Sequence, residues 1–124
     1  MRTRRRKTRV AGITAIVVGA VLLAMATSAL AVTLYWGSTA VKTASVAKCL
    51  GFAETAMHGL SFQNIRKSPN EVAGSSGGAY AAVTCFATAP RATAIVMVAG
   101  NDAGETARVR DSLRQKIAAV VSFD

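Results

Sequence analysis

The sequence predicts an α+β protein: an N-terminal hydrophobic helix, then a small antiparallel sheet of three or so strands packed against two helices, in α-β-β-α order. Three observations predict it. An uncharged apolar run fills residues 10–34, two amphipathic helical patterns lie at either end of the remaining chain, and short strand-like stretches separate them. Amphipathic helices must bury their apolar stripe against another layer. We therefore expect a targeting segment (1–36), a linker leading into the first helix (37–44) and a small domain (45–124).

The N-terminal segment is long enough to cross a membrane. As a helix, the 25 residues from Val10 to Leu34 would measure about 37 Å, against roughly 30 Å of hydrocarbon. Basic residues lie densely before this run and sparsely after it, which places the N-terminus in the cytoplasm and the domain outside. The basic cluster, which we expect to contact anionic lipid, consists of Arg2, Arg4, Arg5, Arg6, Lys7 and Arg9.

Two interpretations of this segment remain open. An uncleaved signal anchor would contact the membrane through residues 10–36, with Tyr35 and Trp36 at the interface. A signal peptide would instead be cleaved near Ala26 or Ala31, where small residues recur. The first gives a single-pass protein of the cell membrane with a periplasmic or surface-exposed domain, and the second gives a secreted protein.

The charge of the chain argues against a nucleic-acid partner. The net charge is +9, from 15 basic and 6 acidic residues. Six basic residues precede Val10, and the other nine exceed the six acidic ones by only three. A nucleic-acid-binding domain concentrates its positive charge on the folded part. We expect no nucleic acid, and the sequence indicates no particular protein partner.

The first helix of the domain is predicted to run to about His58. Its apolar stripe recurs at spacings of three and four residues. Gly59 follows directly, and we expect it to end the helix in a left-handed conformation. The stripe consists of Val46, Cys49, Leu50, Ala53, Ala56 and Met57.

The strands are predicted between the two helices. Leu60–Ile65 alternates briefly, Glu71–Gly74 is a candidate strand, and Ser75–Gly78 resembles a hairpin connection. Ala79–Thr88 alternates, and Thr93–Ala99 is β-branched and almost continuous, which favours a strand strongly. In Ala79–Thr88 we expect Tyr80, Ala82, Thr84 and Phe86 on one face, and Ala81, Val83 and Cys85 on the other.

The last helix is predicted to begin after Asp102. Asp102 and Glu105 have the spacing of a capping box, in which the two side chains bind the free amide groups of the first turn. The apolar stripe that follows predicts a helix to about Ser122 and consists of Val109, Leu113, Ile117 and Val120.

Cys49 and Cys85 are the most specific chemical signal in the sequence. In an exported domain, two cysteines favour a disulfide, and a loop of this length would stabilise the fold by roughly 3–4 kcal/mol. No catalytic, cofactor-binding or metal-ligating residues are predicted. His58 is the single histidine, and the glycine-rich stretch Gly74–Gly78 precedes a strand and lacks the lysine of a phosphate-binding loop.

A resemblance supports this fold and location. The stretch Tyr80–Cys85, the strand Ile95–Gly100 and the stretch Ala107–Leu113 resemble a group of small exported bacterial proteins of unknown function. In that group a cysteine-bearing helix precedes a β-hairpin, a V-A-G-x-D junction (here Val98–Asp102) and a second helix. The resemblance covers roughly Val46 to Val120 and implies export and fold, but no activity.

The expected function is therefore that of a non-enzymatic small cell-envelope protein, membrane-anchored or secreted, with a binding or accessory role. The alternative is a secreted hydrolase or enzyme inhibitor, released after cleavage of the signal peptide. The scarcity of catalytic side chains counts against the enzyme more than against the inhibitor.

Overall fold

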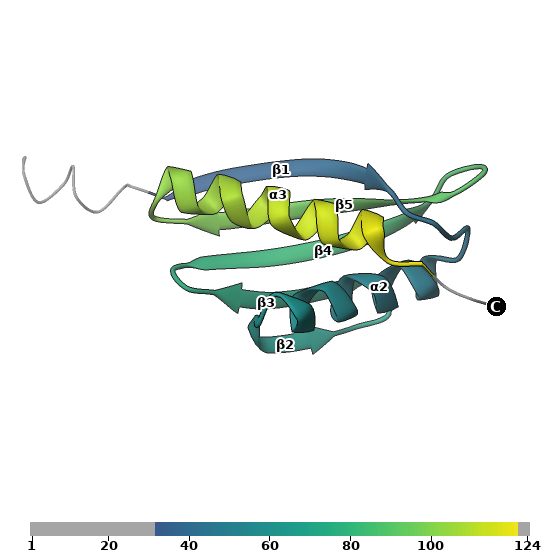
Figure 1. Cartoon of the computed structure of the whole chain (residues 1–124), viewed down its shortest axis with the longest axis horizontal. Helices are drawn as coiled ribbons and strands as arrows, with labels where there is room; N and C mark the ends of the chain where they lie inside the picture. The colour runs from purple at the N-terminus through teal and green to yellow at the C-terminus, as the bar shows by residue number, and fades with distance from the viewer. Residues whose placement is uncertain (1–31, 122–124) are drawn as a thin grey trace, which may run out of the picture. The chain divides into compact units, whose positions relative to one another are not determined.

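The computed structural model describes residues 32–121, which contain five strands and two helices (Figure 1). The strands in chain order are β1 (Thr33–Ala40), β2 (Gln63–Lys67), β3 (Glu71–Ser76), β4 (Ala79–Ala87) and β5 (Ala92–Gly100). Helix α2 (Val46–Gly59) lies between β1 and β2, and helix α3 (Ala103–Ala119) follows β5.

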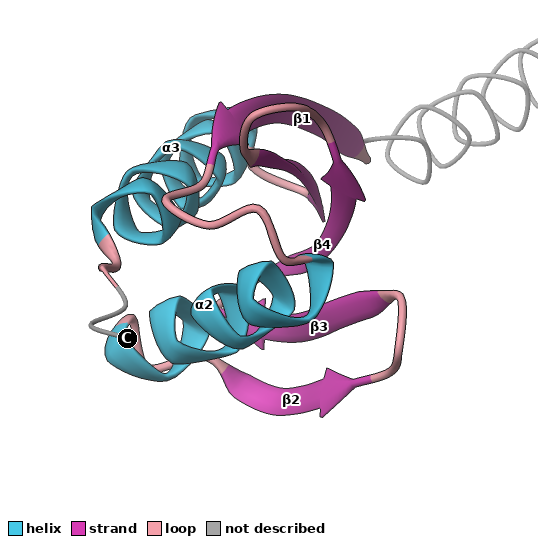
Figure 2. Ribbon diagram, turned by 90° about the vertical axis from the view of Figure 1, so that its right-hand side faces the viewer, coloured by secondary structure: helices cyan, strands magenta, loops and turns pink. Residues whose placement is uncertain are grey.

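The five strands form one antiparallel sheet in the order β1-β5-β4-β3-β2. Both helices cover the same side of the sheet (Figure 2). Helix α3 packs mainly on β1 and β5, and α2 packs mainly on β4 and β3. The predicted α+β class, with an antiparallel sheet against two helices, is confirmed, but the sheet has five strands instead of about three.

Strand β1 corrects the predicted boundary of the domain. It pairs with β5 along its whole length, from Thr33 opposite Gly100 to Ala40 opposite Thr93. The expected linker over 37–44 is therefore wrong in its first half, and Trp36 lies in a strand instead of closing a membrane span. The sequence pattern did not predict this strand, because it continues the apolar run and its pairing partner lies about sixty residues away. The predictions for residues 1–31 lie outside the described residues.

Strand β2 is displaced from the alternation predicted over Leu60–Ile65. Its pairing with β3 shifts register between Gln63 and Arg66, and Asn64 adopts a positive φ of 53°. A bulge of this kind bends an edge strand, and asparagine tolerates the left-handed conformation better than most residues. The alternation of the sequence is therefore interrupted within the strand itself.

The end of α2 differs from the prediction at Gly59. The left-handed residue is Ser61, with φ of 59°, and Gly59 is the last helical residue. The amide of Phe62 donates to the Met57 carbonyl at 2.9 Å, and that of Ser61 donates to the His58 carbonyl at 3.1 Å. These two bonds define a Schellman motif. Phe62 and Met57 are both buried, so the motif also closes an apolar contact at the helix end.

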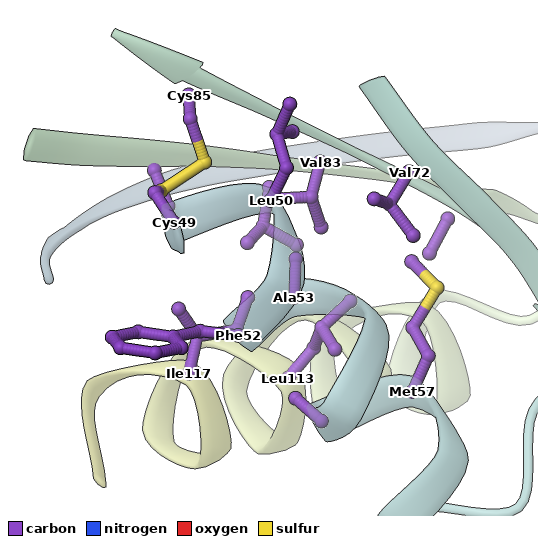
Figure 3. Packing of buried hydrophobic residues seen from close by; sticks show 14 of the residues in the cluster. Cys49, Leu50, Phe52, Ala53, Met57, Val72, Val83, Cys85, Leu113 and Ile117 are labelled. Atoms are coloured by element: carbon purple, nitrogen blue, oxygen red, sulfur yellow. A yellow bond between two sulfur atoms is a disulfide. The ribbon is translucent and has the colours of Figure 1, made fainter. Parts of the chain in front are cut away.

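The core lies between the helices and the inward face of the sheet. Cys49 on α2 and Cys85 on β4 form a disulfide within it (Figure 3). This bond confirms the predicted pairing. The inward positions of the central strands are small or β-branched, and they pack against Leu113 and Ile117 of α3. The predicted division of β4 into two faces holds, since Ala81, Val83 and Cys85 are buried while Tyr80 and Phe86 are exposed.

The start of α3 is capped by its own N-terminal residue and lies close to the sheet and to the β3–β4 turn. Asp102 caps the helix by accepting a hydrogen bond from the Glu105 amide at 2.7 Å. The Glu105 side chain does not complete the predicted capping box in return, because its Oε1 accepts from the amide of Gly78 in the β3–β4 turn at 3.3 Å. A Cβ on Gly100 would lie 2.5 Å from the Thr106 hydroxyl. The glycine of the V-A-G-x-D junction is thus explained by the close approach of α3.

The disulfide should carry a large share of the stability. We expect the double variant Cys49→Ala, Cys85→Ala to lose about 3 kcal/mol, because the bond closes a loop over a sequence separation of 36 residues. For a domain of this size, that loss lowers the thermal midpoint by roughly 12–24 °C. Reductant should shift the native protein in the same way and leave the double variant unchanged. Equal midpoints before and after reduction would contradict the prediction.

The helix end offers a second test with a built-in control. We expect Ser61→Gly to raise the free energy of unfolding by about 0.5 kcal/mol, because glycine relieves a left-handed strain of about 1 kcal/mol but loses more chain entropy. Gly59→Ala should not destabilise the protein, since Gly59 is helical and its Cβ would meet only the flexible end of Lys116. Denaturant titration of both variants tests this. If Gly59→Ala destabilised the protein and Ser61→Gly did not stabilise it, Gly59 would be the left-handed residue that ends the helix.

Candidate functional site

The side of the sheet that neither α2 nor α3 covers is the strongest candidate for a functional surface (Figure 2). Antiparallel pairing places alternate residues of neighbouring strands in rows on this side. One row joins Leu34, Ala99 and Tyr80, and the next joins Trp36, Met97 and Ala82. We call the surface the open face. On β1, β5 and β4 it consists of Leu34, Trp36, Ser38, Ala40, Thr93, Ile95, Met97, Ala99, Tyr80, Ala82, Thr84 and Phe86.

Large apolar side chains on the open face are exposed to an unusual degree. Trp36 is 67% exposed, Leu34 62%, Tyr80 53%, Phe86 49% and Met97 38%. On the opposite side of the same strands, the valines that alternate with them are fully buried. Scattered apolar residues are normal on a protein surface, but a contiguous group of aromatic and aliphatic side chains marks an interaction site.

The open face is also free of charge on its three longest strands. None of its residues on β1, β5 and β4 is acidic or basic. The first charged residues are at its border, where Glu71 of β3 pairs with Thr84 and Arg66 of β2 pairs with Ala73. Depletion of charge together with enrichment in Trp, Tyr, Phe and Met is the composition of the centre of a protein–protein interface.

The outer edge of β1 is occupied by arginines of α3. The Arg114 guanidinium donates two hydrogen bonds to the Ser38 carbonyl, at 3.0 and 2.8 Å. Gly37 makes this possible, because a Cβ there would lie 2.9 Å from Arg114 Cδ. Arg110 lies 5.3 Å from the centre of the Tyr35 ring. Charged side chains at a strand edge disfavour pairing with another strand.

The two arginines are held by a carboxylate. Asp111 accepts a hydrogen bond from Arg110 Nε at 2.9 Å, and its Oδ1 lies 3.7 Å from Arg114 Nη1. The hydrogen bond from Arg110 lowers the pKa of Asp111 below its usual value. Asp111 therefore stays ionised at a lower pH than an isolated aspartate would, and it contacts both Arg110 and Arg114.

A hollow beside α3 does not have the chemistry of a nucleophilic active site. It measures about 330 Å³ and lies between the end of α2 and one side of α3. Its polar side chains include Ser76, Ser112, Glu105 and Arg108, but Glu105 already binds the β3–β4 turn. His58 is exposed in the last turn of α2 and does not line it. A serine nucleophile needs an oriented base, which these residues do not supply.

The residues singled out from the sequence have structural roles. Cys49 and Cys85 are joined, Asp102 caps α3, and Glu105 links α3 to the β3–β4 turn. Within residues 32–121, no cluster of three or more His, Cys, Asp or Glu side chains could hold a metal ion. Neither helix in that part of the chain has both the length and the apolar character needed to cross a membrane.

Sequence reasoning missed the open face because it missed β1. The face of β4 that carries Tyr80 and Phe86 was predicted, but Trp36 was assigned to a membrane interface. The residue types Thr33, Tyr35, Trp36 and Thr39 favour a strand weakly, but they directly continue the apolar run. No known protein family, curated protein or solved structure matches the chain, so the surface is interpreted from its own chemistry.

The open face should be dispensable for folding. We expect Trp36→Thr to change the free energy of unfolding by less than about 0.5 kcal/mol, because the side chain is 67% exposed and threonine suits a strand. Val96→Ala, on the covered side of the neighbouring strand, should cost on the order of 2 kcal/mol by leaving a cavity. Denaturant titration compares the two. A loss of 2 kcal/mol or more for Trp36→Thr would mean that the indole belongs to the folded core.

Proposed function

We propose that this chain is a non-enzymatic small protein of the bacterial cell envelope, which acts by binding a partner through the open face. The observation that carries the proposal is the charge-free apolar surface formed by Leu34, Trp36, Tyr80, Phe86 and Met97 on a sheet whose other side packs against α2 and α3. These side chains contribute little to the core, so binding explains their presence better than folding does.

Export is supported by the N-terminal sequence and by the disulfide. With β1 beginning at Thr33, the apolar run before it still contains 23 residues, from Val10 to Val32. That length corresponds to about 34 Å of helix, enough to cross a membrane. The basic residues before it favour a cytoplasmic N-terminus, where they would contact anionic lipid. The bond between Cys49 and Cys85 suits an oxidising compartment.

We propose the anchored form, with the domain on the outer side of the cytoplasmic membrane. Cleavage after Ala26 or Ala31 is the alternative, and either cut would leave β1 intact because the strand begins at Thr33. The released domain would then be a secreted binding protein or an enzyme inhibitor. A secreted hydrolase is the weaker alternative, because the hollow beside α3 offers no nucleophile with an oriented base.

Reporter fusions test the location. A reporter that is active only outside the cytoplasm, fused after Asp124, should be active, and a reporter that is active only in the cytoplasm should be silent. Chains that begin at Val32 should reverse both results, because they lack the basic and apolar segments. An active cytoplasmic reporter on the full chain would contradict export. The mass of the exported protein, 12.8 kDa if uncleaved, distinguishes the anchored form from the released form.

A further inference from the structure

We infer that the partner of the open face is a second copy of this chain, bound face to face to form a two-sheet homodimer. This inference rests on the proposed function, because it names the occupant of the same surface. Two antiparallel sheets commonly pack face to face about 10 Å apart, with their apolar side chains interdigitated. The open face provides such side chains on three adjacent strands, with Trp36 on the edge strand β1, Met97 on β5 and Tyr80 on β4.

The size of the open face is sufficient for a dimer. The sheet has five strands, and the longest have eight or nine residues. At about 4.8 Å per strand and 3.3 Å per residue, the whole face measures roughly 24 Å by 25 Å, and this area includes β3 and β2, which carry Glu71 and Arg66 on the same side. Two copies would thus cover roughly 1,200 Å² in total, which is at the lower end of specific protein–protein interfaces. Aromatic side chains that stand out from the sheet increase this area.

The charges favour a second copy over a partner of a different kind. Homodimer interfaces are more apolar than transient ones, and the open face has no charged residue on β1, β5 and β4. A lipid surface or an acidic partner would call for a basic border. Here one carboxylate, Glu71, and one guanidinium, Arg66, border the same side of the face. Two copies can therefore meet without net repulsion.

The contact of Arg114 with the edge of β1 makes edge-to-edge pairing through this strand less favourable. Edge-to-edge pairing needs free carbonyl groups along the outer strand. Arg114 occupies the carbonyl of Ser38 in the middle of β1. Association through the face leaves these bonds intact, so the dimer can form without any rearrangement of the domain.

Cysteine crosslinking of the full chain in the membranes of producing cells tests the inference. Ala82→Cys places a thiol on β4 in the middle of the open face, close to any two-fold axis that relates stacked sheets. Because Cys49 and Cys85 are bonded to each other, the new thiol is the only one free to react. A short bismaleimide should convert most of the protein to a species of twice the 12.8 kDa chain mass. The matched control is Gln115→Cys, exposed on α3, which should stay monomeric.

A second substitution shows whether the open face itself holds the dimer. Met97 pairs directly with Ala82, so Met97→Lys added to Ala82→Cys would bury a charge in the interface and should reduce the crosslinked species at least tenfold. Met97→Leu should leave it unchanged. Resistance of Cys49 and Cys85 to alkylation reports that each variant is folded.

The outcomes separate the inference from the proposed function. Crosslinked dimer that persists with Met97→Lys would overturn the inference, because contacts elsewhere would then hold the copies together. Monomer alone from Ala82→Cys would also overturn it. A crosslinked species of any mass other than twice the chain would overturn the homodimer while leaving the open face as a binding surface for another protein.

Discussion

The nine-residue pairing between β4 and β5 is the constraint on which the rest of the molecule depends. It runs from Ala79 opposite Gly100 to Ala87 opposite Ala92 and sorts every second residue to one side. A slip by one residue would send Val83 into solvent and Tyr80 into the core. The same register therefore determines which residues form the core and which form the open face. The disulfide of Cys85 then fastens α2 to the side that the register makes apolar.

The covered side of the sheet is built from small residues, and this explains why two helices can lie so close to it. Alanine and glycine positions on β4, β5 and α2 let the backbones approach, and close approach of α3 requires Gly100 and Gly37. Small side chains bury little apolar area each, so the packing alone stabilises the fold modestly. The covalent bond between α2 and β4 offsets that deficit. On β1, β5 and β4, by contrast, the largest apolar side chains lie mainly on the open face.

Strands β4 and β5 and helix α3 could be predicted from the sequence, because each is encoded by neighbouring residues. The disulfide could be predicted because the chain has two cysteines and an export-like N-terminal segment. Strand β1 could not be predicted, since Leu34 and Trp36 continue an apolar run and their pairing partner lies about sixty residues later. At the end of α2, the residue types favoured Gly59 as the left-handed residue that ends the helix. Ser61 adopts that conformation instead, next to the buried Phe62. Only the part of the open face on β4 was predicted, because β1, which carries Leu34 and Trp36, was missed.

The bond from Arg114 to Ser38 joins residues 76 positions apart, and this separation governs the order in which the domain can fold. In a chain threaded outward through a membrane channel behind its N-terminal segment, β1 would emerge first and find neither β5 nor α3. It would wait unpaired until β5 had crossed, because β5 pairs with it along its whole length. Chaperones that recognise extended apolar segments would meet this strand first. The bonds from Arg114 to the Ser38 carbonyl could form only after α3 had followed.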